Sequence, residues 1–406
     1  MNFPRTILAF FLFMLFISCK NEVKKSQPKV VDKSLPNFSS VDFKKIFKTS
    51  DSQLGKEDSI RNILEDYYQN VWEGSNLWGG IIIAKGENIL LEKYRGFTDE
   101  KKQNPINENT SLHIASVSKP ITAMAILKLV ESGKISLNQS LTSILPAFPY
   151  PKITLKNLLN HRSGLPKYEL LEQELKPLPS EFSKEFISNQ DILSLISKHK
   201  PALKREPNTG FEYCNTNYAL LALVIEKVAG KPYPIAVREM IFQPLGMEHT
   251  FVLTEKELPT ASPSFFSNGK MHPYNKLDLI YGDKNIYTTP QDLLRFSQAM
   301  FSSNFLPKNL IKEVFKPYSN EKKGMKNYGL GIRMKIFDNG KALTYHNGWW
   351  HGSNSVFVHL PESKTTIIAL GNKYSRRIYS ATALSGLFED FPFDIESLTK
   401  EPTSGE

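Results

Sequence analysis

Several residue patterns are missing from this 406-residue chain, and each absence narrows what the protein can be. Its two cysteines cannot build a disulfide framework. No Cys-x-x-Cys or His-Glu-x-x-His spacing occurs, so we expect no metal and no other cofactor. The net charge of +10 comes from scattered lysines without an arginine-rich block, which argues against nucleic acid as a partner. A Gly-x-Ser-x-Gly motif is also absent, and this disfavours an α/β-hydrolase esterase.

Long hydrophobic runs are scarce as well. The longest, residues 7–17, has 11 apolar residues, whereas a helix that spans a membrane needs about 20. Arg5 precedes this run, and Ser18-Cys19 ends it before a polar stretch, so the segment resembles a bacterial lipoprotein signal. We therefore expect a bacterial cell-envelope protein, on the periplasmic face or the cell surface, that contacts the membrane through a lipid anchor at Cys19. An ordinary cleaved signal peptide is the alternative.

The most informative stretch runs from His113 to Pro120 and contains Ser116 and Lys119. It leads directly into the apolar segment 115–133, which predicts a buried helix. Residues three apart lie on the same face of a helix, so the hydroxyl and the amine are expected to be neighbours. The unpaired N–H groups of a helix start favour a neutral amine. This combination can make a serine nucleophilic without a histidine. Ser-x-x-Lys alone is common, however, so other residues must support the assignment.

The periodicity of apolar residues places strands near both chain ends and helices between them. Strand patterns cover residues 78–84, 88–94, 328–337, 342–346, 355–360 and 365–370. Helix patterns cover residues 56–72, 115–133, 155–160, 189–198, 217–229, 234–241, 289–300 and 376–387. We therefore expect an α+β fold: an antiparallel sheet built from both chain ends with flanking helices, plus a mostly helical inserted region. A ligand site is expected in the groove between the two parts.

Two further polar stretches stand where packing alone would not require them. Residues 210–221 form a loop that enters a helix, and residues 345–352 end a predicted strand. Together with the serine stretch they supply three motifs in order: Ser116-x-x-Lys119, Tyr213-x-Asn215 and His346-x-Gly348. These motifs resemble those of the serine β-lactamase and penicillin-binding-protein superfamily, most closely its class C-like branch of esterases, D-aminopeptidases and D-Ala-D-Ala carboxypeptidases.

The resemblance covers about residues 55–390 and implies a β-lactamase/transpeptidase-like fold. The expected domains are a lipoprotein signal peptide at 1–18, a tether at 19–55, a β-lactamase-related hydrolase domain at 56–395, and a tail at 396–406. Within the hydrolase domain, residues 56–96 and 327–395 would form the sheet region and residues 97–326 the helical region. The implied enzyme is a serine hydrolase whose partner is a small ester, amide or peptide substrate; its oligomeric state stays open.

The resemblance also implies a role for each motif residue. Ser116 Oγ would attack a carbonyl group and form an acyl-enzyme. Lys119 and Tyr213 would share the task of accepting the proton, and the sequence does not decide which is the main base. Cys214, between the second pair of motif residues, is interpreted as a filler of space, although a cysteine hydrolase is the alternative.

Substrate contacts follow from the same resemblance. Asn215 would donate its amide to the acyl side chain of the substrate, and His346 and Gly348 would line the site. The backbone N–H groups of Ser116 and Trp349 would form the oxyanion hole. On the residues alone, the tyrosine and asparagine of the second motif are also compatible with a turn before a helix.

One departure from the family pattern bears on the substrate. Penicillin-recognising members usually carry Lys-Thr-Gly or Lys-Ser-Gly where this chain has His346-Asn347-Gly348. A histidine is mostly uncharged at neutral pH, and Trp349 and Trp350 add an apolar wall. We therefore expect esters or uncharged acyl groups to be favoured over penicillins. The alternatives are a D-amino-acid-specific peptidase or carboxypeptidase on cell-wall peptides, a true β-lactamase, and a non-catalytic binder of peptidoglycan fragments.

Overall fold

The computed structural model describes residues 54–321 and 326–395. The predicted signal peptide, Cys19, almost all of the predicted tether and the tail from residue 396 lie outside the described residues. Among the residues that are described, no helix is both long and apolar enough to cross a membrane.

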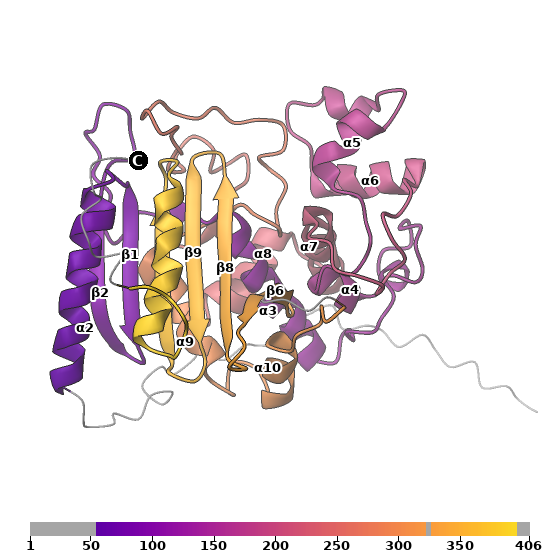
Figure 1. Ribbon diagram of the computed structural model, residues 1–406. Coiled ribbons are helices and arrows are strands. Elements are labelled where there is room, and N and C mark those ends of the chain that lie inside the picture. The colour runs from indigo at the N-terminus through magenta and orange to yellow at the C-terminus, as the bar shows by residue number, and fades with distance from the viewer. Residues whose placement is uncertain (1–53, 322–325, 396–406) are drawn as a thin grey trace, which may run out of the picture. The chain divides into compact units, whose positions relative to one another are not determined.

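A seven-stranded sheet forms the centre of the fold (Figure 1). Every neighbouring pair in it is antiparallel. Its strands, in spatial order, are β2 (Asn88–Arg95), β1 (Gly79–Lys85), β10 (Thr365–Gly371), β9 (Ser353–Leu360), β8 (Ala342–Trp350), β7 (Arg333–Ile336) and β6 (Lys326–Tyr328). Strand β1 pairs with β10, so the two ends of the chain meet in one sheet. The predicted α+β fold, with an antiparallel sheet from both chain ends, is confirmed.

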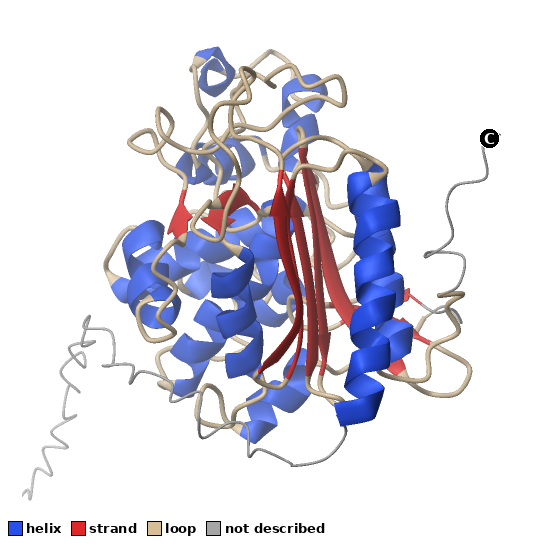
Figure 2. Ribbon diagram, turned by 90° about the vertical axis from the view of Figure 1, so that its left-hand side faces the viewer, coloured by secondary structure: helices blue, strands red, loops and turns tan. Residues whose placement is uncertain are grey.

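The two faces of this sheet are covered by different parts of the chain. Successive residues of a strand point to opposite faces, and here Ile81 and Ile83 join one apolar cluster while Ile82 joins another. Helices α2 (Leu54–Tyr67) and η6 (Arg376–Leu387) cover the first face. Figure 2 shows α2 on one side of the sheet and most of the helices on the other.

The opposite face receives the helical region between β2 and β6, as the sequence indicated. Its helices are η2 (Ala115–Val117), α3 (Ser118–Glu131), η3 (Leu141–Ser143), α4 (Leu155–Leu159), α5 (Tyr168–Glu174), η4 (Ser180–Ser183), α6 (Asn189–His199), α7 (Asn215–Ala229), α8 (Tyr233–Val237), η5 (Arg238–Phe242), α9 (Pro290–Met300) and α10 (Lys308–Val314). Helix α3 is buried nearly all round, as its composition predicted. The π-helical turn η1 (Tyr68–Glu73) lies between α2 and β1 in the chain.

Two local features differ from the prediction. The predicted strand 328–337 is two strands, because the chain turns away after Tyr328 and returns at Arg333. Gly331 has φ +86°, and a side chain at Gly329 would overlap the backbone of Val314, so these glycines permit the break. The helical region also contains a small sheet of β3 (Leu112–His113), β5 (Ile286–Thr288) and β4 (Phe251–Val252). Strands of two or three residues are too short to show alternation in the sequence.

Candidate active site

The turn that carries Ser116 is held in an unusual backbone conformation. Ala115 has φ +46°, in the left-handed region that residues other than glycine rarely adopt. It begins the short helix η2, and α3 follows directly at Ser118. Strain of this kind is frequent at functional sites, where the surrounding structure maintains it. The turn leaves the side chain of Ser116 partly exposed between buried neighbours.

Lys119 lies beside this serine, as the three-residue spacing predicted. Its Nζ donates a hydrogen bond to Ser116 Oγ at 3.1 Å and another to the backbone oxygen of Asp283 at 2.9 Å. The lysine is completely buried. Both hydrogen-bond partners are neutral oxygens, and the remaining side of the ammonium group faces the rings of Tyr213 and Tyr218, 5.0 and 5.6 Å from their centroids. The serine and the amine are therefore in direct contact in a site largely shielded from water.

Tyr213 completes the predicted trio. Its ring lies between the ammonium group of Lys119 and the guanidinium group of Arg333, the latter 4.3 Å from the ring centroid. Its hydroxyl group is buried and has no hydrogen-bond partner among the described residues. The structure thus brings Ser116, Lys119 and Tyr213 together from η2, α3 and the loop before α7.

His161 fixes the loop that carries this tyrosine, a function that the sequence did not indicate. Its Nδ1 accepts hydrogen bonds from the backbone N–H of Cys214 at 3.2 Å and from the amide of Asn217 at 3.1 Å. Its ring packs 4.4 Å from that of Tyr213. Burial, together with the nearby Lys119, holds the pKa of His161 well below its usual value, so the ring is neutral.

Cys214 fills space, as the sequence interpretation preferred. Its thiol is buried and donates to the backbone oxygens of Leu165 and Pro166, at 3.4 Å each. Burial raises the pKa of the thiol to about 11, so it stays protonated at neutral pH. A protonated, buried thiol is a poor nucleophile.

Asn215 begins helix α7, and its side chain does not cap the helix. Its amide nitrogen instead donates to a carboxylate oxygen of Glu169, which lies in α5. Its amide oxygen is buried and has no partner in the described residues. The side chain of Asn215 therefore links α5 and α7.

Strand β8 borders the site with His346, Gly348 and Trp349. His346 is buried, and its Nε2 lies 3.1 Å from the hydroxyl oxygen of Tyr328. Burial lowers its pKa well below the usual value, and Arg333 and Lys119 lower it further, so this histidine is neutral as expected. A side chain at Gly348 would overlap the backbone of Ile114, so the glycine allows β8 to approach the turn that carries Ser116 closely. That approach brings the backbone of Trp349 beside the turn.

Arg333, at the start of β7, is a site residue that the sequence interpretation missed. Its guanidinium group faces the rings of Tyr213 and Tyr328. No ion pair between it and a carboxylate is formed within residues 54–321 and 326–395. The break between β6 and β7 places Arg333 at the start of β7, beside Tyr213. An arginine within a predicted strand does not by itself indicate a functional role, so the sequence did not identify it.

An apolar groove of about 400 Å³ opens beside Trp349. Its walls include Trp349, Phe266 and Tyr374, whose exposed fractions are 63%, 42% and 37%. Large aromatic side chains that are both exposed and adjacent favour binding of an apolar group. The tryptophan wall expected from the sequence thus extends to the loop around residue 266. Within the described residues, no three His, Cys, Asp or Glu side chains gather in a way that could hold a metal ion.

Comparison with known proteins agrees with this geometry. The family model described as Beta-lactamase matches residues 65–383. The chain belongs to the β-lactamase family. It is 28% identical to penicillin-binding protein 4* of Bacillus subtilis over 82% of this chain and 77% of that protein, and 20% identical to a D-aminopeptidase of Gluconobacter oxydans over 80% and 61%. The crystal structure of a penicillin-binding protein from Bacillus halodurans superposes with a TM-score of 0.69 at 28% identity, covering 81% of this chain and 99% of that one.

The resemblance read from the three motifs is therefore confirmed at the level of the family, and so is the β-lactamase/transpeptidase-like fold. The chain is a serine hydrolase of this β-lactamase-related family.

Proposed function

We propose that the protein hydrolyses esters or amides through an acyl-enzyme on Ser116. The observation that carries this proposal is the 3.1 Å hydrogen bond from the buried Lys119 to Ser116 Oγ. As the bond between Oγ and the carbonyl carbon forms, the hydroxyl proton passes to the Lys119–Tyr213 pair. The proton then moves to the leaving group as its bond to the carbonyl carbon breaks. Water repeats the sequence on the acyl-enzyme and releases the acid.

The lysine and the tyrosine act as a coupled pair in this proposal. The amine touches Ser116 Oγ, and the unpartnered phenol oxygen is available to receive or return a proton. Arg333 and the lysine both place a cation beside the ring of this tyrosine. The negative oxygen of the tetrahedral intermediate would be held by the backbone N–H groups of Ser116 and Trp349. Losing one such donor typically lowers the rate by about 100- to 1,000-fold.

The substrate that fits this site best is an ester with an apolar group. His346 is neutral, and the groove beside Trp349 is lined by aromatic side chains. A fluorophosphonate probe, followed by peptide mapping, is expected to label Ser116. The Ser116→Ala variant is expected to lose the label and at least about 1,000-fold of the ester turnover. Label on another residue, or full activity in this variant, would refute the proposal.

A second candidate is a D-amino-acid-specific peptidase, and the position of Arg333 favours it. A guanidinium group without a carboxylate partner can receive the terminal carboxylate of a peptide. Arg333→Gln is expected to raise KM for D-Ala-D-Ala peptides by about tenfold more than it raises KM for neutral esters. Equal effects on both substrates would show that the arginine acts through Tyr213 alone.

Nitrocefin is expected to turn over slowly, and rapid hydrolysis would identify a true β-lactamase.

Envelope anchoring through Cys19 is also proposed, on the support of the apolar run and the cysteine that follows it. Expressed in a bacterium fed with labelled palmitate, the full chain is expected to incorporate the label and to partition into the detergent phase of Triton X-114. Cys19→Ser is expected to lose both properties, while Cys214→Ser serves as the matched control. Labelling that persists in the Cys19 variant would exclude this anchor.

A further inference from the structure

One segment of the chain packs along the start of α3, the helix that carries Lys119. It runs from Gly282 to Ile286 and makes a regular series of contacts with that helix. Gly282 O accepts from the hydroxyl of Thr122 at 2.7 Å, Asp283 O accepts from Lys119 Nζ at 2.9 Å, and the N–H of Ile286 donates to Ser118 Oγ at 3.2 Å. The segment therefore holds Lys119 in place through its backbone.

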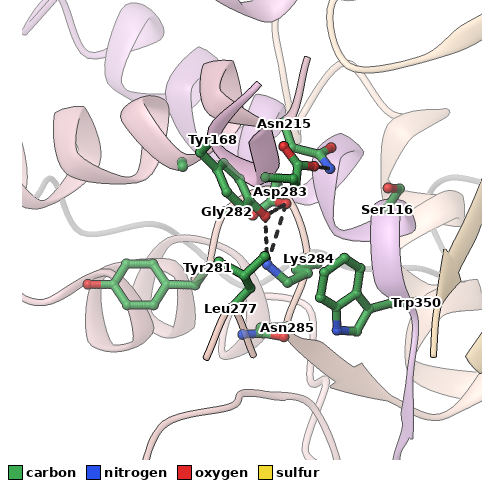
Figure 3. A network of polar contacts seen from close by, with 12 residues as sticks. Ser116, Tyr168, Asn215, Leu277, Tyr281, Gly282, Asp283, Lys284, Asn285 and Trp350 are labelled. Atoms are coloured by element: carbon green, nitrogen blue, oxygen red, sulfur yellow. Dashed lines mark hydrogen bonds and ion pairs between the residues drawn. The ribbon is translucent and has the colours of Figure 1, made fainter. Parts of the chain in front are cut away.

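The same segment buries two opposite charges, Asp283 and Lys284, which Figure 3 shows together with Tyr168. Asp283 and Lys284 are 1% and 2% exposed, and Lys284 Nζ lies 3.8 Å from Asp283 Oδ2. Tyr168 connects them, because its hydroxyl donates to that same oxygen at 2.8 Å and accepts from Lys284 Nζ at 2.7 Å. Removing a charge from water costs several kcal/mol, so each of these charges depends on the other.

Lys284 also links this pair to the strand on the other side of the site. Its Nζ lies between the rings of Tyr168 and Trp350, 5.1 and 4.6 Å from their centroids. Trp350 follows Trp349 in β8, and its indole N–H donates to Asp278. Burial lowers the pKa of Lys284, while the neighbouring carboxylates act in the opposite direction. Other titratable or charged groups that face Lys119 or the buried pair are Glu169, Asp278, Tyr213, Tyr218, Arg333, His161 and His346.

We propose that Asp283 and Lys284 are positioning residues that set the electrostatic environment of the Ser116–Lys119 couple, an inference that rests on the proposed acyl-enzyme function. The Asp283 backbone oxygen fixes the amine of Lys119, and its side chain forms a neutral pair with Lys284. Because the two charges lie together, their effects on Lys119 largely cancel. Lys119 can then gain and lose a proton without a net charge behind it.

The proposal predicts opposite effects for the two charges. Lys284→Met leaves the carboxylate of Asp283 alone, and a nearby negative charge makes the couple hold a proton more strongly. The acid limb of the pH profile of kcat/KM is then expected to move to higher pH. Asp283→Asn leaves the ammonium group alone, and the acid limb is expected to move to lower pH. The two limbs should differ by at least about one pH unit, since a charge at close range shifts a neighbour by about 1 to 3 units.

The experiment measures these profiles for the full chain with a neutral ester, after each variant has been shown to react with a fluorophosphonate at Ser116. The double variant Asp283→Asn/Lys284→Met has no net charge behind Lys119 and is expected to return the limb to within about 0.3 unit of the wild type. Lys284→Arg keeps the charge and is expected to do the same. Lys231→Met, which breaks a partly exposed ion pair with Glu239, is the matched control.

A purely structural role would lower stability or kcat without moving the two limbs in opposite directions. Limbs that coincide, or that move in the same direction, would overturn the proposal while leaving Ser116 as the nucleophile. Absence of the label from Ser116 in the wild type would overturn the proposed function as well. If Lys284→Met does not fold, Asp283→Asn alone decides: a limb at lower pH supports the pair's role, and an unchanged limb refutes it.

Discussion

The two faces of the seven-stranded sheet differ in the side chains that they bury. On the face under α2 and η6, the strands contribute Ile81, Ile83 and their apolar neighbours on β9 and β10. On the other face, the same strands and β8 contribute Ile82 and Phe357 but also His346 and His359, both completely buried. Alternate positions along one strand therefore divide between an apolar cluster and a second cluster that also contains buried polar side chains.

This difference shows where buried polar groups are concentrated. Lys119, Asp283, Lys284 and His346 are all buried, and all lie on the helical side of the sheet. Burying such groups costs free energy, which the apolar packing elsewhere must offset. Substitutions on the two faces should therefore separate activity from stability, and the following predictions test that separation.

The largest effect is expected from Lys119, compared with a second lysine on the same helix. Lys119→Met removes the group that touches Ser116 Oγ and should lower kcat/KM for an ester by at least about 100-fold. Lys128→Met is the matched control, because Lys128 is also buried on α3 but pairs with Glu131 at 2.9 Å. Its effect should appear in thermal unfolding and not in kcat/KM. A loss of only a few-fold in Lys119→Met would show that Tyr213 suffices as the base.

A smaller effect, and on stability alone, is expected from the apolar face. Ile83 is completely buried in the cluster under α2. Ile83→Ala should lower the free energy of unfolding by about 2–5 kcal/mol, since it removes buried methylene groups and leaves a cavity. Urea unfolding measures this change, while kcat with an ester should stay within twofold. Ile89→Ala, on β2 and 37% exposed, is the control and should change stability little. A large fall in kcat for Ile83→Ala would mean that the two faces are coupled.

The sheet and the contact between Ser116 and Lys119 could be predicted from the sequence because each has a local signal. Alternating apolar residues mark strands, and three residues of helix bring Ser116 beside Lys119 wherever the helix lies. Tyr213 and Gly348 could be assigned because they occur in motifs whose order is informative. The family and the fold followed from those motifs, and the comparisons confirm both.

The remaining site residues could not be predicted, because distant segments bring them together. Arg333 reaches Tyr213 only because the chain breaks between β6 and β7, and His161 supports the same tyrosine from 52 residues earlier. Asp283 contacts Lys119 through its backbone oxygen, a group that every residue has and that the sequence therefore cannot mark. Contacts of this kind depend on tertiary packing, which no local pattern encodes.

The smallest expected effect is a loss of stability at acidic pH. The pH dependence of the free energy of unfolding should distinguish substitutions on the two faces of the sheet. Burial lowers the pKa of His113 and of His359 to about 3, whereas a histidine in the unfolded chain has a pKa of about 6.5. Below pH 6.5 the unfolded chain therefore binds more protons, and stability that is complete above this pH is lost as the pH falls toward 3. Each such histidine should lower the free energy of unfolding by about 2 kcal/mol between pH 7 and pH 5.

His359→Asn removes one of these histidines, whose Nδ1 lies 2.8 Å from Ser297 Oγ. Between pH 7 and pH 5, the free energy of unfolding of this variant should fall by about 2 kcal/mol less than that of the wild type. Ile83→Ala, on the apolar face, should lower the free energy of unfolding equally at both pH values, because no titrating group is removed. Urea unfolding at the two pH values measures both changes. The contrast between the faces fails if the isoleucine variant alters the pH dependence, or if the histidine variant leaves it unchanged. In the first case a proton would be linked to apolar packing, and in the second His359 would titrate alike in the folded and unfolded chains.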